Sequence, residues 1–294
     1  MKQHYRSCLS PCAWIIWITL VSSCQTPTPE QNPSQDQVKI EAAQIVRGNP
    51  TDISCENLPG GCVHFDIQYP HIAQGKPMLK LAVYQWSRNF VLSQMGQHTL
   101  KKVNSSVLDT AQTLVELIDD FFVIAKLDLE EIKKEPTWGH THHSPMIRLE
   151  TDFQVLHNTG RLLTLQLTSQ VVRDTIHQSY QSILTFDTAY GTSLTWEQVT
   201  DQPQVLETMI TLLGEEPLFS PEDLTQSYPY TAILDTGLLL YHQKIPNQWA
   251  VEVPMLPQMD EARHALVIPQ ETYQPFVKDI YLQDLPSQDL PSID

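Results

Sequence analysis

The sequence has few basic residues, few cysteines and none of the short motifs that mark common catalytic sites. Its 294 residues include 18 lysines and arginines against 34 aspartates and glutamates, which gives a net charge of −16 at pH 7. Nucleic-acid binding needs a basic surface, so this balance argues against a DNA- or RNA-binding protein. The acidity would attract basic partners, although it can also serve solubility alone.

Catalytic signatures are missing as well. The chain has no Gly-x-Ser-x-Gly elbow, no phosphate-binding loop and no dinucleotide fingerprint. Thr185-Phe186-Asp187 is similar to the first motif of metal-dependent polysaccharide deacetylases, but Thr188 replaces their second aspartate and their His-x-x-x-His set is absent. A turn in which Asp187 accepts hydrogen bonds explains the motif fully. We therefore expect no enzyme and no cofactor, and a deacetylase-related enzyme is the third alternative.

The apolar run near the N-terminus is too short to span a membrane. Residues 13–21 form it, far fewer than the roughly 20 residues that a spanning helix needs. Lys2 and Arg6 precede the run, and Val21-Ser22-Ser23-Cys24 ends it. A basic start, a short apolar run and small residues are typical of a secretory signal peptide. The cysteine after them indicates a lipoprotein, whose mature chain begins at the lipid-bearing Cys24; an uncleaved anchor is the alternative.

The lipoprotein interpretation predicts where in the cell the mature protein is located. Residues 1–23 are the signal peptide, and their removal takes Lys2 and Arg6, which changes the net charge from −16 to −18. Because Gln25 rather than Asp follows the cysteine, we expect the outer membrane, facing the periplasm, in a cell with two membranes. Residues 24–37 are rich in Thr, Pro, Gln, Asn and Ser and predict a flexible tether.

Two cysteines remain after the signal peptide and the lipid-bearing residue are set aside. Cys55 and Cys62 flank a Pro-Gly-Gly sequence that favours a tight reversal of the chain. An oxidising compartment favours a disulfide between them. Metal binding and a redox role are the alternatives, but the pair lacks further ligands at suitable spacing and is not Cys-x-x-Cys.

A cluster of histidines is the sharpest metal candidate. His140, His142 and His143 lie within four residues and could hold a divalent cation. No carboxylate in the segment completes such a site, so a surface loop with solvated histidines is the favoured interpretation.

Hydrophobic periodicity changes along the chain from helical to alternating. Residues 63–69 alternate as a strand that Pro70 is expected to end, and helices are expected over residues 79–95, 106–125 and 202–213. Period-two patterns around turns predict three hairpins, over residues 146–172, 181–194 and 230–241, and further strands over residues 249–253 and 265–268. Helices and strands grouped in this way predict an α+β fold with an antiparallel sheet, packed helices and a hairpin-rich C-terminal half.

Three stretches resemble a bacterial envelope family known as domain of unknown function 3298, which often follows a domain numbered 4163. They are Phe186-Asp187-x-x-x-Gly191-x-x-Leu194-Thr195, Leu234-Asp235-x-Gly237-Leu238 and Leu266-Val267-Ile268-Pro269. The resemblance implies a 4163-like part over residues 38–170 and a 3298-like part over residues 171–282. A repeated Asp-Leu-Pro-Ser sequence near the end predicts a disordered tail over residues 283–294. Asp174-Thr175-Ile176-His177 departs from the family's Gly-Gly-Ala-His.

What the resemblance implies about function is recognition at the cell wall. Such domains occur in the extracellular part of a membrane-bound anti-sigma factor that senses lysozyme by binding it, and in front of the catalytic domain of some peptidoglycan deacetylases. We therefore expect a lipid-anchored binding or sensing protein with a basic partner such as a lysozyme-type hydrolase. A protein that binds cell-wall glycan or maintains the envelope is the alternative.

Overall fold

The computed structural model describes residues 38–48, 61–98, 113–134, 146–174, 176–212, 230–241 and 265–286. These residues lie within one compact unit, Asp36–Asp294. The expected signal peptide and tether lie outside the described residues.

The first six strands along the chain form one sheet, in the same order as in the sequence. Its strands are β1 (Lys39–Gly48), β2 (Cys62–Gln74), β3 (Met146–Thr159), β4 (Leu162–Arg173), β5 (Ile176–Asp187) and β6 (Thr192–Ser193). All neighbours are antiparallel except β2 and β3, which are parallel. A parallel pair needs a long crossover, and here two helices lie between the strands in the sequence. This arrangement confirms the expected α+β class.

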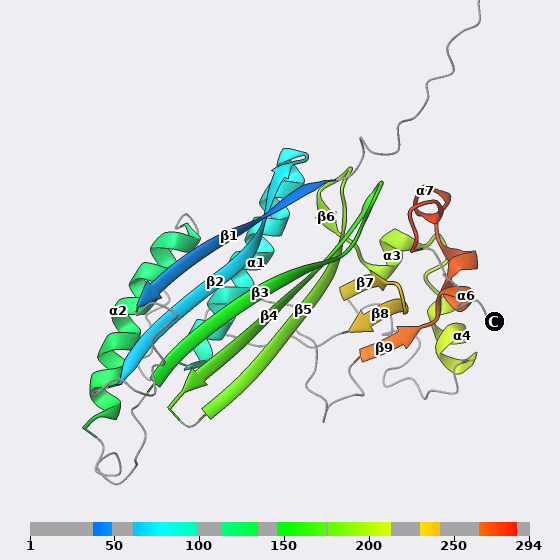
Figure 1. Ribbon diagram of the computed structural model, residues 1–294. Helices are drawn as coiled ribbons and strands as arrows, with labels where there is room; N and C mark the ends of the chain where they lie inside the picture. Colours follow the sequence, from blue (N-terminus) through cyan, green and yellow to red (C-terminus); the bar gives the residue numbers. More distant parts are fainter. Residues whose placement is uncertain are drawn as a thin grey trace, which may run out of the picture. The chain divides into compact units, whose positions relative to one another are not determined.

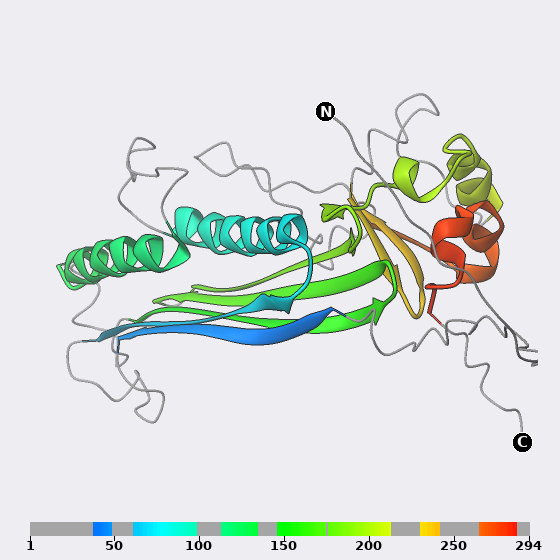
Figure 2. The same cartoon turned by 90° about the horizontal axis from the view of Figure 1, so that it is seen from above.

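Both long helices, α1 (Pro77–His98) and α2 (Leu114–Ile132), cover the same face of this sheet (Figures 1 and 2). Trp86 of α1 is buried against β5, where its Nε1–H donates to Ser182 Oγ at 3.0 Å and its ring meets Phe186 edge-on at 5.6 Å. Within the described residues, no helix covers the opposite face in this view. Asp152 and Gln170 are exposed on it, whereas Thr164 and Thr185, toward its other end, are fully buried.

The helix boundaries are set by capping as much as by periodicity. The expected helix over residues 79–95 is confirmed within α1. The helix expected over residues 106–125 is found as α2, which begins at Leu114 and extends to Ile132. A reciprocal capping box between Thr113 and Glu116 fixes its start. Residues 101–112 lie outside the described part.

The expected hairpins are confirmed. β3 and β4 are joined by Gly160 and Arg161, and Gly160 has a φ of +47°. A Cβ there would lie 2.0 Å from a carboxylate oxygen of Asp284, so the position requires glycine. Asp174 has a φ of +55°, and aspartate tolerates this left-handed region better than most residues, so it can serve where the resembling family has glycine.

The expectation that Pro70 ends its strand is wrong. β2 continues to Gln74, and Pro70 pairs with Ala42 of β1. The β2–β3 register ends at Ile67, so Pro70 has a registered neighbour on one side only. Proline is tolerated at such an edge position because the ladder there lacks one partner.

A second, three-stranded sheet contains β7 (Tyr230–Leu234), β8 (Gly237–Tyr241) and β9 (Ala265–Ile268). With it pack α3 (Trp196–Val199), α4 (Val205–Leu212), α6 (Gln270–Tyr273), η6 (Gln274–Phe276) and α7 (Asp279–Leu282). The sheets meet where Thr185 Oγ1 accepts from Ile233 N at 2.8 Å and Thr164 Oγ1 donates to Ile233 O at 2.8 Å. These bonds give the buried backbone N–H and C=O groups of Ile233 their hydrogen-bond partners at the junction of the two sheets. The strand expected over residues 249–253 lies outside the described part.

The expected division of the chain can be placed on these elements. The boundary between residues 170 and 171 falls within β4, which pairs with a neighbour on each side. The ordered structure extends to Pro286, past residue 283 where the tail was expected to start, because Asp284 is buried against the β3–β4 turn. Residues 287–294 lie outside the described part.

None of the helices within the described ranges is long and apolar enough to cross a bilayer.

Candidate functional site

Most residues singled out from the sequence lie outside the described part of the chain. This holds for the lipidation candidate Cys24, for Cys55, and for the histidines His140, His142 and His143. Cys62 is described: it opens β2, is buried and is disulfide-bonded. Its pairing with Cys55 stays a prediction, as do the lipid and the histidine loop.

Asp187 is described, and it acts as the turn acceptor that the sequence predicted. Its Oδ1 accepts from the backbone N–H groups of Ala189 at 2.7 Å and Tyr190 at 3.0 Å. Its Oδ2 accepts from Arg161 Nη2 at 2.8 Å and from the Tyr281 hydroxyl at 2.8 Å. The Asp187 side chain is fully buried, and these four donors account for its charge.

The partners of Asp187 tie the C-terminal segment to the first sheet. The Arg161 guanidinium lies 5.0 Å from the centre of the Tyr190 ring and 5.4 Å from that of Tyr281. Burial raises the pKa of Tyr281, and the hydrogen bond to the carboxylate raises it further. We call Arg161, Asp187 and Tyr281 the buried joint. Its carboxylate has no surface for a substrate, so its role is structural.

The open face of the six-stranded sheet is chemically different. Alternation of side chains puts every second residue of β2 to β5 on the face away from α1 and α2. In β3, Ile147 and Leu149 face the helices and are buried, whereas Glu150 is half-buried and Asp152 is exposed. Polar residues of this face include His64, Asp66, Gln68, Arg148, Glu150, Asp152, Thr168, Gln170, His177, Ser179 and Gln181.

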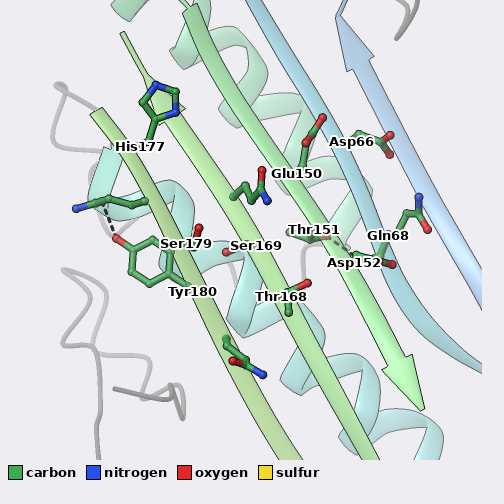
Figure 3. Close-up of a pocket in the computed structure, with 13 residues that line it drawn as sticks. Asp66, Gln68, Glu150, Thr151, Asp152, Thr168, Ser169, His177, Ser179 and Tyr180 are labelled. Atoms are coloured by element: carbon green, nitrogen blue, oxygen red, sulfur yellow. Dashed lines mark hydrogen bonds between the residues drawn. The ribbon is translucent and has the colours of Figure 1, made fainter. Parts of the chain in front are cut away.

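Strand register arranges these polar residues in rows across the sheet. One row runs from Asp66 through Glu150 and Gln170 to Ser179, each residue paired with the next. The row beside it contains Asp152, Thr168 and Gln181. Figure 3 shows the labelled members on the strands with the helices behind them.

Carboxylates dominate the middle of this open face. Asp66 accepts from Gln44 Nε2 at 2.7 Å, and Glu150 is ion-paired with Arg148. Asp152 accepts from the backbone N–H of Phe153 at 2.7 Å. Three carboxylates therefore lie on this part of the face, of which Glu150 alone is ion-paired with Arg148, and each keeps accepting capacity, because an ionised carboxylate has about four lone-pair sites.

The face is hollowed where these rows lie. The hollow has a volume of about 1020 Å³, and amide, hydroxyl and carboxylate side chains dominate its lining. Among the described residues that line it, Tyr180 is the only Phe, Tyr or Trp; its ring is half-buried against the helix-side core, and its hydroxyl donates to Gln178 Oε1 at 2.7 Å. An arrangement of this kind can bind cationic or hydrogen-bonding groups over a broad surface.

Our reading of the sequence missed this surface, although a signal for it was present. The expected strands alternate apolar residues with His64, Asp66 and Gln68 in β2, and with Glu150 and Asp152 in β3. This periodicity predicts which residues share a face. It does not reveal that β2 and β3 are neighbours, since residues 75–145 lie between them. Among the described residues, no three His, Cys, Asp or Glu side chains form a group that could hold a metal ion.

Comparison with known proteins gives structural neighbours only. No protein-family model matches the sequence, and no curated protein matches it. The structure is similar to a DUF3298-family member from Bacteroides fragilis NCTC 9343, with 10% identity and a TM-score of 0.47, over 84% of this chain and 96% of that one. It is also similar to a DUF3298-family protein from Pseudomonas aeruginosa PAO1, with 11% identity and a TM-score of 0.41, over 85% of this chain and 97% of that one.

Proposed function

We propose that this chain is a lipid-anchored protein of the cell envelope that binds a basic protein, and that the open face is its binding surface. The single observation that carries the proposal is the hollow in that face, where Asp66, Glu150 and Asp152 lie among hydrogen-bonding side chains. A lysozyme-type hydrolase has the required positive charge. The motif resemblance to lysozyme-sensing domains supports the same partner class.

Charge supports a protein partner over a glycan. A glycan site commonly uses an exposed aromatic ring as a platform, and the ring of Tyr180 packs toward the core instead. Carboxylates steer cationic partners toward the surface, and this raises the association rate more than it lowers the dissociation rate. Cell-wall glycan binding is the second candidate, because the amide and hydroxyl groups of the hollow could also bind sugar hydroxyls.

Two measurements test this proposal. Metabolic labelling with a fatty-acid analogue should mark the wild-type chain and leave Cys24→Ala unlabelled. The full-length protein in detergent should bind immobilised hen lysozyme, and association should slow several-fold as salt rises from about 0.05 to 0.15 M, where the screening length shortens to about 8 Å. Peptidoglycan is itself a substrate of lysozyme, so it is tested separately: incubated with the protein alone, it should show little binding and be recovered chemically unchanged.

A charge-matched pair of variants separates specific binding from general acidity. The variant Asp66→Asn/Glu150→Gln/Asp152→Asn should bind lysozyme at least tenfold more weakly. The control Asp201→Asn/Glu271→Gln/Asp279→Asn removes the same charge from exposed residues outside the open face and should change binding less than twofold. Equal losses would reduce the interaction to net charge, and binding to peptidoglycan without binding to lysozyme would favour the glycan alternative.

A further inference from the structure

One part of the first sheet and its helix layer lacks acidic residues in an otherwise acidic chain. Residues 67–108 contain five lysines and arginines and no aspartate or glutamate, whereas the whole chain has 34 acidic residues. This stretch includes the end of β2 and all of α1. The first turn of α1 has no acidic residue, although the helix dipole favours one there. The sequence of α1 therefore departs from the usual preference for acidic residues in the first helical turn, and this departure requires another explanation.

The start of α1 also exposes large apolar side chains. Met78 is 58% exposed, Leu81 is 48% exposed, and Tyr190 of the β5–β6 loop is 66% exposed. That loop lies against the helix start, because a Cβ on Gly191 would be 2.4 Å from Leu79 N and 2.7 Å from Met78 Cβ. The exposed residues therefore belong to one neighbourhood.

Two lysines lie among these apolar residues. Lys76 Nζ donates to the backbone oxygen of Ala189 at 2.9 Å, beside Tyr190. Lys80 Nζ donates to the backbone oxygen of Ala73 at 3.0 Å. Both side chains are exposed, and each ammonium group keeps further donors. We call Lys76, Met78, Lys80, Leu81 and Tyr190 the apolar–basic patch.

Two carboxylates of neighbouring elements are already paired. Asp187 is buried and paired with Arg161, whose guanidinium lies by the Tyr190 ring. Glu41 is paired with Lys39 at 2.8 Å. The patch itself contains two lysines and no acidic residue, so its own side chains present positive charge together with apolar surface.

The chain enters the fold beside this patch. Val38, the first described residue, packs in the same core cluster as Leu79 and Ile72, and its N–H donates to Asn158 Oδ1 at 3.3 Å. Cys24 precedes Val38 by 14 residues. A chain of that length has a mean span of about 20 Å if it is flexible and reaches about 50 Å when extended.

We propose that the apolar–basic patch rests on the anionic surface of the bilayer that holds the lipid of Cys24, and so fixes the orientation of the protein. The inference rests on the lipidation in the proposed function. Lysines bind lipid phosphates, and Met78, Leu81 and Tyr190 reach the boundary between headgroups and acyl chains. The lipid retains the protein at the membrane, and the acidic remainder of the molecule is repelled from the same surface.

This orientation explains how the open face stays available. Glu150 and Asn158 are eight residues apart on β3, which corresponds to about 26 Å along the strand. The chain entry at Val38 bonds to Asn158, so the carboxylates of the open face lie well away from the bilayer end. The patch and the binding surface can therefore be occupied at the same time.

Site-specific depth measurements test the orientation. The full-length lipidated protein carries a single bimane label at Met78→Cys, in vesicles of phosphatidylethanolamine and phosphatidylglycerol that contain nitroxide-headgroup lipid. The matched control is Val123→Cys on α2, whose native residue is also 58% exposed and apolar. The parent chain without an added cysteine measures background labelling. We expect at least threefold stronger quenching at position 78 than at position 123.

Further variants and vesicle compositions identify the cause of any difference in quenching between the two positions. Lys76→Gln/Lys80→Gln, or vesicles of phosphatidylcholine alone, should bring the ratio of quenching toward one. Equal quenching at the two positions in protein that floats with the vesicles would overturn the orientation and leave the lipid anchor intact. Protein that fails to float would overturn the anchor and, with it, this inference. Protection of position 78 by lysozyme in the absence of vesicles would make the patch a protein interface instead.

Discussion

The buried joint and the open face both place carboxylates on the first sheet, with opposite consequences. Asp187 in the joint is fully buried and receives four hydrogen bonds from the chain itself. Glu150 on the open face is half-buried and ion-paired with Arg148. A carboxylate whose donors all come from its own fold stabilises that fold. One with spare lone pairs on a hollow surface can serve a ligand.

The comparison also separates a conspicuous motif from a useful surface. Phe186-Asp187 stands out in the sequence and is similar to a catalytic motif, yet its carboxylate is enclosed by Arg161 and Tyr281. The polar residues of the open face form no motif, because they come from different strands. The burial of each polar group and the number of its hydrogen-bond partners distinguish the structural carboxylate from the binding surface better than the sequence does.

Removing the carboxylate of the joint should have the largest effect on stability. Asp187→Ala leaves Arg161 without its ion-pair partner and takes away the acceptor for two backbone N–H groups. Loss of one partner from a buried pair destabilises by about 3–5 kcal/mol. Urea denaturation of the full-length protein should show this as a lower midpoint. A loss below about 1 kcal/mol would mean that the joint is not a structural centre.

The sequence predicts part of this joint and part of the open face. The acceptor role of Asp187 follows from its place before Ala189-Tyr190-Gly191, because turn chemistry is local. Tyr281 lies 94 residues further on, and no periodicity connects it with Asp187. Partners this distant depend on tertiary packing, which a single sequence does not show.

The first strand illustrates the same limit. Residues 39–48 lack regular alternation, and no strand was expected there. They form β1 because β2 supplies ten paired positions along an antiparallel edge. By contrast, the 146–172 and 230–241 hairpins have local turns and clear period-two patterns, and both are confirmed. Local signals predicted elements, and long-range pairing determined which polar residues became neighbours.

Removing only the Tyr281 hydroxyl should have an intermediate effect. Tyr281→Phe keeps the ring beside Arg161 and loses one hydrogen bond to a charged acceptor, for which we expect a loss of about 1.5–3 kcal/mol at pH 7. Urea denaturation measures it. A phenylalanine variant as stable as wild type would show that Arg161 and the backbone donors suffice for Asp187.

The same variant should change the pH dependence at high pH. The pKa of Tyr281 is raised in the folded protein, so above about pH 10 the unfolded chain loses this proton first. The unfolded state then binds fewer protons, and the free energy of unfolding falls as pH rises. Tyr281→Phe should show a shallower fall above pH 10, and its curve should run parallel to wild type between pH 7 and 9. Equal slopes above pH 10 would contradict the enclosed hydroxyl.

Neutralising a carboxylate of the open face should have the smallest effect on stability. Glu150→Gln loses a partly exposed ion pair with Arg148, and such pairs contribute about 0.2–1 kcal/mol. It also removes a like charge directly opposite Asp66 in the register, and that relief offsets part of the loss. We expect a net change within about 0.5 kcal/mol in urea denaturation, which should shrink further in 1 M salt. The matched control is Glu130→Gln, because Glu130 pairs with Lys133 in an exposed position on α2 away from the open face. Both variants should be about equally stable, while only Glu150→Gln weakens lysozyme binding. A loss of stability near that of Asp187→Ala would place Glu150 among the structural carboxylates and remove it from the binding surface.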